Sequence, residues 1–165
     1  MPTPLRLHTH CSYCGVVYGT EQPWPHVCAA CGNTTYRNPL PVAVLVLPVD
    51  GGVLTVRRAI PPRQGQLALP GGFIDHGEAW QAAAVRELRE EAGIVIAADE
   101  VTLFDVHSAP DGTVLIFGTV PPRRVSDLPV FVANTEVSER VVIVRPETLA
   151  FPLHARVVER WFAAR

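Results

Sequence analysis

The sequence predicts an α/β domain preceded by a small cysteine-rich module. Apolar runs of strand length alternate with two helical segments after residue 37. Two Cys-x-x-Cys-Gly turns lie within residues 1–36. A glycine-rich loop then opens into a segment with three closely spaced glutamates, at residues 72–94. The alternation is compatible with an α/β fold, although it does not establish the architecture alone.

Composition narrows the class of protein. The chain has 165 residues, enough for one domain with a real core, or for such a domain plus a small module. It is 48% hydrophobic, which excludes bulk disorder. The net charge is −2, and all 14 formal positive charges are arginines, without a basic block, so a nucleic-acid partner is not expected. No apolar run approaches the roughly 20 residues that span a membrane, and Met1–Arg6 lacks an apolar signal core, so we expect a cytoplasmic protein.

The first element is the cysteine module. Cys11, Cys14, Cys28 and Cys31 form two pairs with two-residue spacing, and a glycine follows each pair and permits a tight turn. In a reducing compartment four thiols favour a closed structural Zn²⁺ site over disulfides, whereas a redox centre needs only one pair. The module resembles a zinc ribbon, and we expect residues 1–36 to depend on the metal for folding.

The strands come next. Val42–Val49 is a β-branched apolar run, and Asp50-Gly51-Gly52 turns the chain into a hairpin partner, Val53–Arg58. Beyond the glutamate segment, the runs 101–107 and 113–120 form a second hairpin around Asp111-Gly112. A further strand is expected at 141–146, preceded by Glu136 and Glu139. Residues 154–162 have apolar side chains at helical spacing.

The glutamate segment predicts a helix from about Glu78 to Ala92. Glu78 complements the positive helix N-terminus, and Gly93 is suited to a left-handed stop. The apolar side next to the glutamates is expected to pack, with Trp80 in the core.

Three glutamates share one face of this helix. Glu87, Glu90 and Glu91 fall within a sector of roughly 100°, and like charges four residues apart weaken a helix. Ala79 and Ala83 on the same stripe are expected to leave space beside the carboxylates. An ordinary solvated acidic face is the better interpretation of the glutamates alone. It does not explain the glycines before and after them, whereas a divalent cation site would.

These residues resemble the Nudix hydrolase family. The family motif G-x5-E-x7-R-E-U-x-E-E-x-G-U, with U an aliphatic residue, is matched at nine fixed positions over 23 residues. The matching residues are Gly72, Glu78, Arg86, Glu87, Leu88, Glu90, Glu91, Gly93 and Ile94. The resemblance covers roughly residues 37–165 and implies an α/β/α sandwich with a mixed sheet. The module placed before the domain is similar to the arrangement in NADH pyrophosphatases.

The resemblance implies Mg²⁺- or Mn²⁺-dependent hydrolysis of a nucleoside diphosphate linked to another moiety. Metal ligands at Glu87, Glu90 and Glu91 follow from the motif, and hard cations do prefer carboxylate oxygen. The general base stays open between Glu90 and Glu91, with Glu136 as a remote candidate whose alternative is a solvated loop acid. Arg86 is expected to orient a glutamate. Arg57, Arg58, Gly71 and Gly72 are the expected substrate contacts, although arginines at a strand end are as often merely exposed.

Substrate choice is less determined. The Ser-Gln-Pro-Trp-Pro-Phe-Pro element of NADH pyrophosphatases is absent downstream of the motif, and Gln22–Pro25 lies in the cysteine module instead. We therefore place an ADP-ribose-like substrate first and NADH or NAD second. A regulatory domain that binds a nucleotide without hydrolysing it is the alternative from another class, and a homodimer is possible because dimers are common among relatives.

Overall fold

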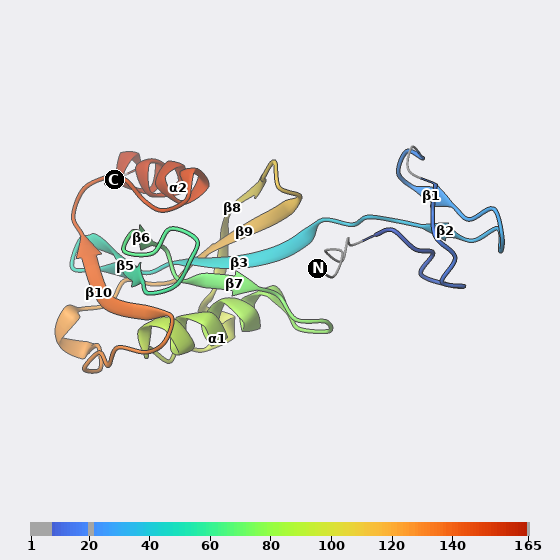
Figure 1. Cartoon of the computed structure of the whole chain (residues 1–165). Coiled ribbons are helices and arrows are strands. Elements are labelled where there is room, and N and C mark those ends of the chain that lie inside the picture. Colours follow the sequence, from blue (N-terminus) through green and yellow to red (C-terminus); the bar gives the residue numbers. More distant parts are fainter. Residues whose placement is uncertain (1–7, 20–21, 165) are drawn as a thin grey trace. The chain divides into compact units, whose positions relative to one another are not determined.

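The computed structural model describes residues 8–19 and 22–164. The chain divides into two compact units, residues 1–39 and 40–165, and each is described by itself (Figure 1). Within the described residues, no helix is both long and apolar enough to cross a lipid bilayer.

The N-terminal unit is built from two matching turns. In each turn a glycine amide donates to the carbonyl of the first cysteine, Gly15 to Cys11 at 3.0 Å and Gly32 to Cys28 at 2.8 Å. Both glycines have positive φ, of 76° and 72°, which a glycine adopts without steric cost. The unit also contains two short strands that pair antiparallel, β1 (His26–Val27) and β2 (Thr34–Thr35).

A four-stranded mixed sheet forms the centre of the second unit. Its strands are β3 (Leu40–Val46), β7 (Gly71–Phe73), β8 (Thr102–Ser108) and β9 (Thr113–Thr119), in the order β7-β3-β9-β8. Strands β3 and β9 run parallel, and the other two pairings are antiparallel. The hairpin expected around Asp111-Gly112 is the β8–β9 pair. The mixed sheet confirms the predicted fold class.

A second sheet is made by β10 (Val137–Ile143), β5 (Gly52–Arg58) and β4 (Pro48–Val49), with β6 (Leu67–Ala68) also pairing with β5. The β4–β5 hairpin turns at Asp50 and Gly51, whose φ angles are 45° and 83°. Positive φ at both central residues is the requirement of the favoured two-residue hairpin turn, and Asp-Gly meets it. The turn follows the prediction, but the expected single strand Val42–Val49 is divided between β3 and β4, which belong to different sheets.

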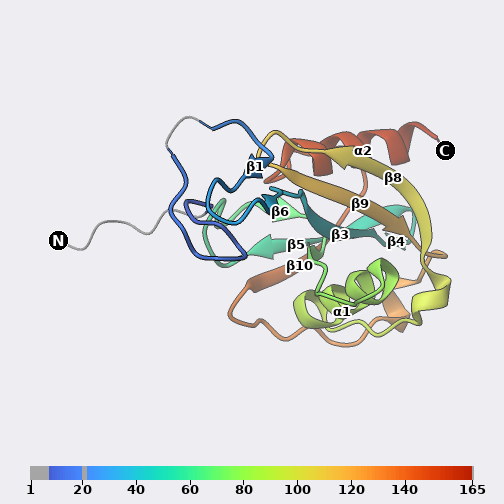
Figure 2. The same ribbon diagram turned by 90° about the vertical axis from the view of Figure 1, so that its right-hand side faces the viewer.

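Helices cover the structure from opposite sides, with α1 (Trp80–Ala92) below the strands and α2 (Pro152–Ala163) above them (Figure 2). Alternate residues of β3 serve the two faces: Ala43 and Leu45 pack in the cluster with α1, whereas Val44 and Val46 pack in the cluster with α2. Short 3-10 turns occur at Ala98–Glu100 and Val125–Asp127. This three-layer arrangement confirms the expected sandwich.

Three local expectations need correction. The helix begins at Trp80, after an extended Ala79, so Glu78 lies outside its first turn and binds Arg86 instead of capping the helix. Strand β10 begins at Val137, four residues earlier than expected, so Glu139 lies within it and pairs with Arg57. Ala83 is fully buried in the core, so it leaves no open space beside the carboxylates.

Candidate active site and cysteine cluster

The three helix glutamates of α1 differ sharply in their exposure. The Glu91 residue is 8% exposed and the Glu87 side chain 14%, whereas the Glu90 side chain is 50% exposed. Two of the three carboxylates therefore face inward, towards the strand β7 that precedes the helix. A solvated acidic face does not bury carboxylates in this way, because burial of an unpaired charge is costly.

Two glycines of β7 receive these inward carboxylates. The amide of Gly71 donates to Oε2 of Glu91 at 3.0 Å. A Cβ added at Gly72 would lie 2.4 Å from Oε1 of Glu87 and 2.7 Å from its Oε2. The Glu87 carboxylate thus packs directly on the Gly72 backbone, and any larger residue there would displace it. Close approach between side chain and backbone is the physical reason for glycine at this position.

Arg86 binds the acidic residues around it. Its Nε and Nη2 atoms donate to the two oxygens of Glu78, each at 2.9 Å. Its Nη1 atom donates to Glu87 at 2.6 Å and to Glu90 at 3.3 Å. Nη2 also donates to the Phe73 carbonyl at 3.0 Å. The guanidinium therefore connects β7, the loop before the helix, and α1, and it fixes the position of the Glu87 carboxylate.

The inward carboxylates are electrostatically unfavourable without further positive charge. Burial, with repulsion from Glu87 and Glu136, raises the pKa of Glu91 to about 7. Burial also raises the pKa of Glu87, against the opposing influence of Arg86. Several carboxylate oxygens that repel one another in a half-buried site form the donor set that a hard divalent cation prefers. The donor chemistry suits Mg²⁺ or Mn²⁺, but among the described residues only the four cysteines lie close enough together to hold one ion as they stand.

The two strand-end arginines have different surroundings. Arg57 is occupied, because its Nε donates to Glu139 at 2.6 Å and its Nη1 to the Gly65 carbonyl at 3.0 Å. Arg58 donates through Nε to the Pro62 carbonyl at 2.9 Å, and its guanidinium lies 5.2 Å from the centre of the Phe151 ring. Its two Nη groups make no hydrogen bond within residues 8–19 and 22–164. Arg58 is therefore the better placed of the two to receive a ligand anion.

Glu136 lies on the loop before β10, which returns to α1. Asn134 joins the two, since its side-chain nitrogen donates to the Glu90 carbonyl at 2.9 Å and its oxygen accepts the Glu136 amide at 2.9 Å. Glu136 is exposed, yet its charge acts on both Glu87 and Glu91. The structure thus brings this remote residue near the helix glutamates.

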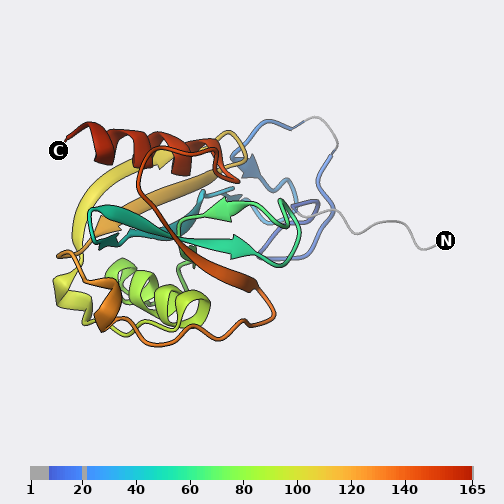
Figure 3. The same cartoon turned by 90° about the vertical axis from the view of Figure 1, so that its left-hand side faces the viewer.

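A large pocket begins at Gly71 and Gly72. Its volume is about 680 Å³, and most of its lining is apolar. None of the α1 glutamates is among the described residues that line it; Gly71 and Gly72, which contact Glu91 and Glu87, line it together with Arg58, Phe73, Phe151 and His154. Figure 3 shows the second sheet and α2 of this unit from the side opposite to that of Figure 2. Pockets of this size and character accommodate small organic ligands.

The aromatic and histidine residues of this pocket were not predicted from the sequence. His154 is buried at the start of α2, where its ring packs between Phe117 and Phe151. The sequence signal for it was a histidine among the apolar residues of the C-terminal helical segment, which indicates a buried polar side chain. The long sequence separation between β7 and α2 hid its proximity to Gly71.

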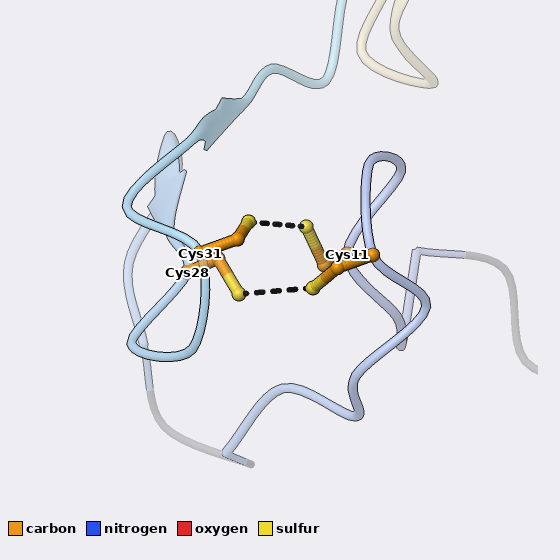
Figure 4. Close-up of side chains that lie close together, drawn as sticks. Cys11, Cys28 and Cys31 are labelled. Carbon is orange, nitrogen blue, oxygen red and sulfur yellow. Dashed lines mark hydrogen bonds between the residues drawn. The ribbon is translucent and has the colours of Figure 1, made fainter.

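The four cysteines of the N-terminal unit converge. Their sulfurs all lie within 4.8 Å of one another, with 3.7 Å between Cys11 and Cys31 and 3.6 Å between Cys14 and Cys28 (Figure 4). In a tetrahedron with zinc–sulfur bonds of about 2.3 Å, sulfurs lie roughly 3.8 Å apart. Backbone amides, that of Cys14 first, lower the pKa of Cys11, whereas, against the backbone amide of Val16, the neighbouring thiols raise the pKa of Cys14, as expected for sulfurs that share a small space without a cation. The cluster therefore fits one tetrahedral ion.

Comparison with known proteins finds a matching family model and several relatives. A family model described as NUDIX domain matches residues 38–163. An ADP-ribose pyrophosphatase from Methanocaldococcus jannaschii is 36% identical over 76 residues, covering 46% of this chain and 44% of that protein. The NAD-capped RNA hydrolase NudC from Escherichia coli is 29% identical over 92 residues, covering 55% of this chain and 35% of that protein. The matched stretch is thus less than half the length of either relative.

Solved structures extend the likeness to nearly the whole chain. A NUDIX hydrolase from Nitrosomonas europaea superposes with a TM-score of 0.78 at 26% identity, covering 95% of this chain and 92% of that one. The NUDIX domain of Shewanella oneidensis NrtR, complexed with ADP ribose, gives a TM-score of 0.62 at 24% identity, covering 78% and 90%. The second likeness bears on the fold alone.

Proposed function

This chain belongs to the Nudix hydrolase family, and we propose that it hydrolyses a nucleoside diphosphate linked to a second moiety, with ADP-ribose as the leading substrate. The observation that carries the proposal is the placement of two inward carboxylates, Glu87 and Glu91, behind the glycines that open a pocket of about 680 Å³. A diphosphate at this junction would lie beside the acidic residues, while the moieties it links would reach away from them.

The proposed cation ligands are Glu87, Glu90 and Glu91. A bound Mg²⁺ or Mn²⁺ would neutralise phosphate charge and lower the pKa of a coordinated water. Arg86 positions Glu87 through the 2.6 Å ion pair, and the Gly71 amide positions Glu91. These two contacts restrict the carboxylates to one arrangement, which reduces the entropy lost when the substrate complex forms.

We assign the proton-accepting role to Glu91, with Glu90 and Glu136 as the alternatives. Glu91 is buried, and the Gly71 amide fixes the position of its carboxylate. Glu90 is instead exposed and held by Arg86 and Arg89. Arg58 is the proposed phosphate contact, because its two Nη groups are directed by no hydrogen bond within the described residues. Gly71 and Gly72 line the pocket and are the proposed backbone contacts of the substrate.

NADH or NAD hydrolysis is the second candidate. The matched NudC relative favours it, because that protein is named for hydrolysis of NAD-capped RNA. The products separate the two candidates. Cleavage of ADP-ribose at the diphosphate releases AMP and ribose 5-phosphate, whereas cleavage of NADH releases AMP and the reduced nicotinamide mononucleotide.

For the N-terminal unit we propose one structural Zn²⁺ bound by Cys11, Cys14, Cys28 and Cys31. The support is the approach of four sulfurs to within 4.8 Å of one another in two matched turns. We propose that residues 1–36 are the zinc ribbon and that residues 37–165 are the hydrolase domain.

The decisive experiment is a hydrolysis screen with Mg²⁺ or Mn²⁺ across ADP-ribose, NADH, FAD, dinucleoside polyphosphates and nucleoside triphosphates, with identification of products. Glu91→Gln is expected to lower turnover at least 100-fold while the circular dichroism spectrum stays unchanged. Glu159→Gln, at an exposed glutamate of α2, is the matched control and should retain activity. Full activity in Glu91→Gln would refute the assignment. Tight nucleotide binding without turnover would favour a regulatory domain instead.

A further inference from the structure

We propose that His154 is a specificity-determining residue, whose Nε2–H donates a hydrogen bond to a ring nitrogen of the substrate's adenine base in the pocket beside Gly71 and Gly72. The inference rests on the proposed function and deepens it, because it states which part of the substrate enters the pocket and what recognises it there.

The hydrogen bonding of the His154 ring assigns its tautomer. The Leu69 amide, a donor only, lies 3.2 Å from Nδ1 of His154. Nδ1 must therefore accept, and in a neutral imidazole the remaining proton is then on Nε2. Burial, together with the charge of Arg58, lowers the pKa of His154 to about 3, so the ring is neutral at ordinary pH. His154 therefore presents an uncharged donor of fixed orientation.

The Nε2 atom is available to a ligand. It makes no hydrogen bond to any residue in the described part of the chain. Among the side-chain nitrogen and oxygen atoms there that are sealed from solvent, only Nδ1 of His26 lacks a partner, so Nε2 of His154 is not sealed. His154 is one of the residues that line the pocket, and we infer that Nε2 reaches solvent there. Packing against Phe117 and Phe151, with ring centres 5.7 and 5.0 Å away, restricts the imidazole.

The character of the pocket selects the base over the other moiety. Its walls include Val42, Val44 and Leu115 and the aromatic rings of Phe73 and Phe151, and the polar Asp111 and Thr113 at its edge are hydrogen-bonded to each other. A ribose phosphate would leave several hydroxyl groups without partners against such walls, at a cost for each one. A planar heteroaromatic ring gains from apolar and aromatic contact and needs few polar partners. One neutral donor matches one unprotonated ring nitrogen.

Charge fixes the direction of the bound nucleotide. Arg58 lines the same pocket, and its charge acts on both Glu91 and His154. Gly71 likewise belongs to the pocket and contacts Glu91. The phosphates are therefore expected at the Arg58 and Gly71 end, with the base extending from there to His154.

Two substitutions of His154 separate recognition from packing. In His154→Asn the side-chain oxygen can take the place of Nδ1 and keep the Leu69 amide paired, but no donor reaches the Nε2 position. In His154→Gln an amide N–H reaches the Nε2 position, but the bond to Leu69 is lost. If His154 has only a structural role, the affinity for AMP should change in step with the melting temperature across the two variants. A recognition role predicts that the two properties separate.

The measurement is calorimetric binding of AMP and of ribose 5-phosphate to the zinc-loaded full-length protein and both variants. We expect His154→Asn to weaken AMP binding roughly tenfold, as for loss of one hydrogen bond, without changing ribose 5-phosphate binding. His154→Gln should bind AMP more tightly than His154→Asn does, although it melts at a lower temperature. The proposal is wrong if AMP affinity follows the melting temperature, or if AMP binds no more tightly than ribose 5-phosphate.

Ligand analogues give an independent test. The unprotonated ring nitrogens of adenine in AMP are N1, N3 and N7, and the 1-, 3- and 7-deaza analogues each replace one of them by CH. One analogue is expected to bind the wild type roughly tenfold more weakly than AMP does, and as well as AMP does to His154→Asn. Equal binding of all three analogues to the wild type would overturn the proposal. AMP binding needs no turnover, so a protein that binds AMP through His154 without hydrolysing any diphosphate would refute the proposed function alone.

Discussion

The amide of Gly71 donates a 3.0 Å hydrogen bond to the carboxylate of Glu91. This contact joins strand β7 to helix α1 at the point where the chain buries a carboxylate. The hydrogen bond favours the ionised form of Glu91, but burial and the neighbouring charges of Glu87 and Glu136 outweigh it and raise the pKa to about 7. The site is therefore strained electrostatically in the absence of added positive charge.

The first prediction concerns stability without Mg²⁺ or Mn²⁺. The folded-state pKa of Glu91 lies above its unfolded value, so the folded state binds more protons between about pH 4.5 and 7. The wild type then loses stability as pH rises through this window, and the neutral glutamine of Glu91→Gln does not. At pH 8 we expect Glu91→Gln to be more stable than the wild type by about 1–3 kcal/mol, with a much smaller difference at pH 5. Urea denaturation at both pH values measures this.

The control for this prediction is Glu159→Gln, which removes the same charge from an exposed site of α2 and should change stability little at either pH. Addition of Mg²⁺ or Mn²⁺ should raise the melting temperature of the wild type more than that of Glu91→Gln, because a cation relieves the repulsion only where the charge is present. Equal pH dependence in wild type and Glu91→Gln would contradict the raised pKa.

A second prediction follows from the packing of Glu87 on Gly72. In Gly72→Ala the new methyl group would lie within 2.4–2.7 Å of the carboxylate atoms, so Glu87 must move away from its bond to Arg86. A displacement of this kind at a catalytic group costs on the order of 100-fold in turnover. Gly19→Ala is the control, because an added Cβ there meets no atom within 4 Å. Retention of turnover by Gly72→Ala would show that the position of Glu87 does not matter.

Local sequence signals predicted much of the fold. Asp50-Gly51 and Asp111-Gly112 predicted both hairpins, because few residue pairs tolerate the positive φ angles of tight turns. Gly93 predicted the end of α1, and it has a φ of 69°. The start of α1 was less predictable. Glu78 is as suitable for a helix N-terminus as for an ion pair, and only the folded structure brings Arg86 within 2.9 Å of it.

Only the features of the site that depend on residue spacing within one element could be predicted from the sequence. Helical periodicity put Glu87, Glu90 and Glu91 on one face, but the burial that separates Glu91 from Glu90 depends on β7, which packs from outside the helix. Arg57 and Arg58 are neighbouring residues of the same type, so the sequence does not show that their surroundings differ. Their different surroundings arise because the pleat of β5 turns one side chain towards Glu139 and the other towards Phe151.

The third prediction compares these two arginines. Arg58→Gln is expected to raise KM for ADP-ribose roughly tenfold, since one charged contact to phosphate is worth about 1.5–3 kcal/mol. Arg57→Gln breaks an exposed ion pair with Glu139, which contributes at most about 1 kcal/mol to stability, and should leave KM within about twofold of the wild type. Steady-state kinetics on both variants decide the matter. Equal effects of the two substitutions would argue against Arg58 as the phosphate contact.

The fourth prediction concerns the cysteine cluster. We expect native mass spectrometry to find one Zn²⁺ per chain, and Cys28→Ser to release it, because Cys28 is buried and the unit has little apolar core of its own. Loss of zinc should unfold the N-terminal unit, as seen by protease cleavage within residues 8–39. Cys28→Ser with full zinc content and unchanged proteolysis would contradict this expectation. His10→Asn tests whether a flanking histidine contributes, and should leave the zinc content unchanged.

The last prediction follows from the burial of His154. Its folded-state pKa is lowered to about 3, whereas an unfolded histidine titrates near 6.5, so the unfolded chain binds more protons between these values. Stability is therefore complete above about pH 6.5 and decreases as pH falls. Between pH 7.5 and 5 the titration of this residue alone should lower the free energy of unfolding of the wild type by about 2 kcal/mol.

In His154→Asn that contribution is absent, because asparagine does not titrate. The difference in unfolding free energy between the two proteins, measured with urea at both pH values, should shrink by that amount at pH 5. Other titrating groups, including the cysteines, affect both proteins equally and cancel in the comparison. A constant difference would mean that His154 is protonated as readily in the folded protein as in the unfolded chain.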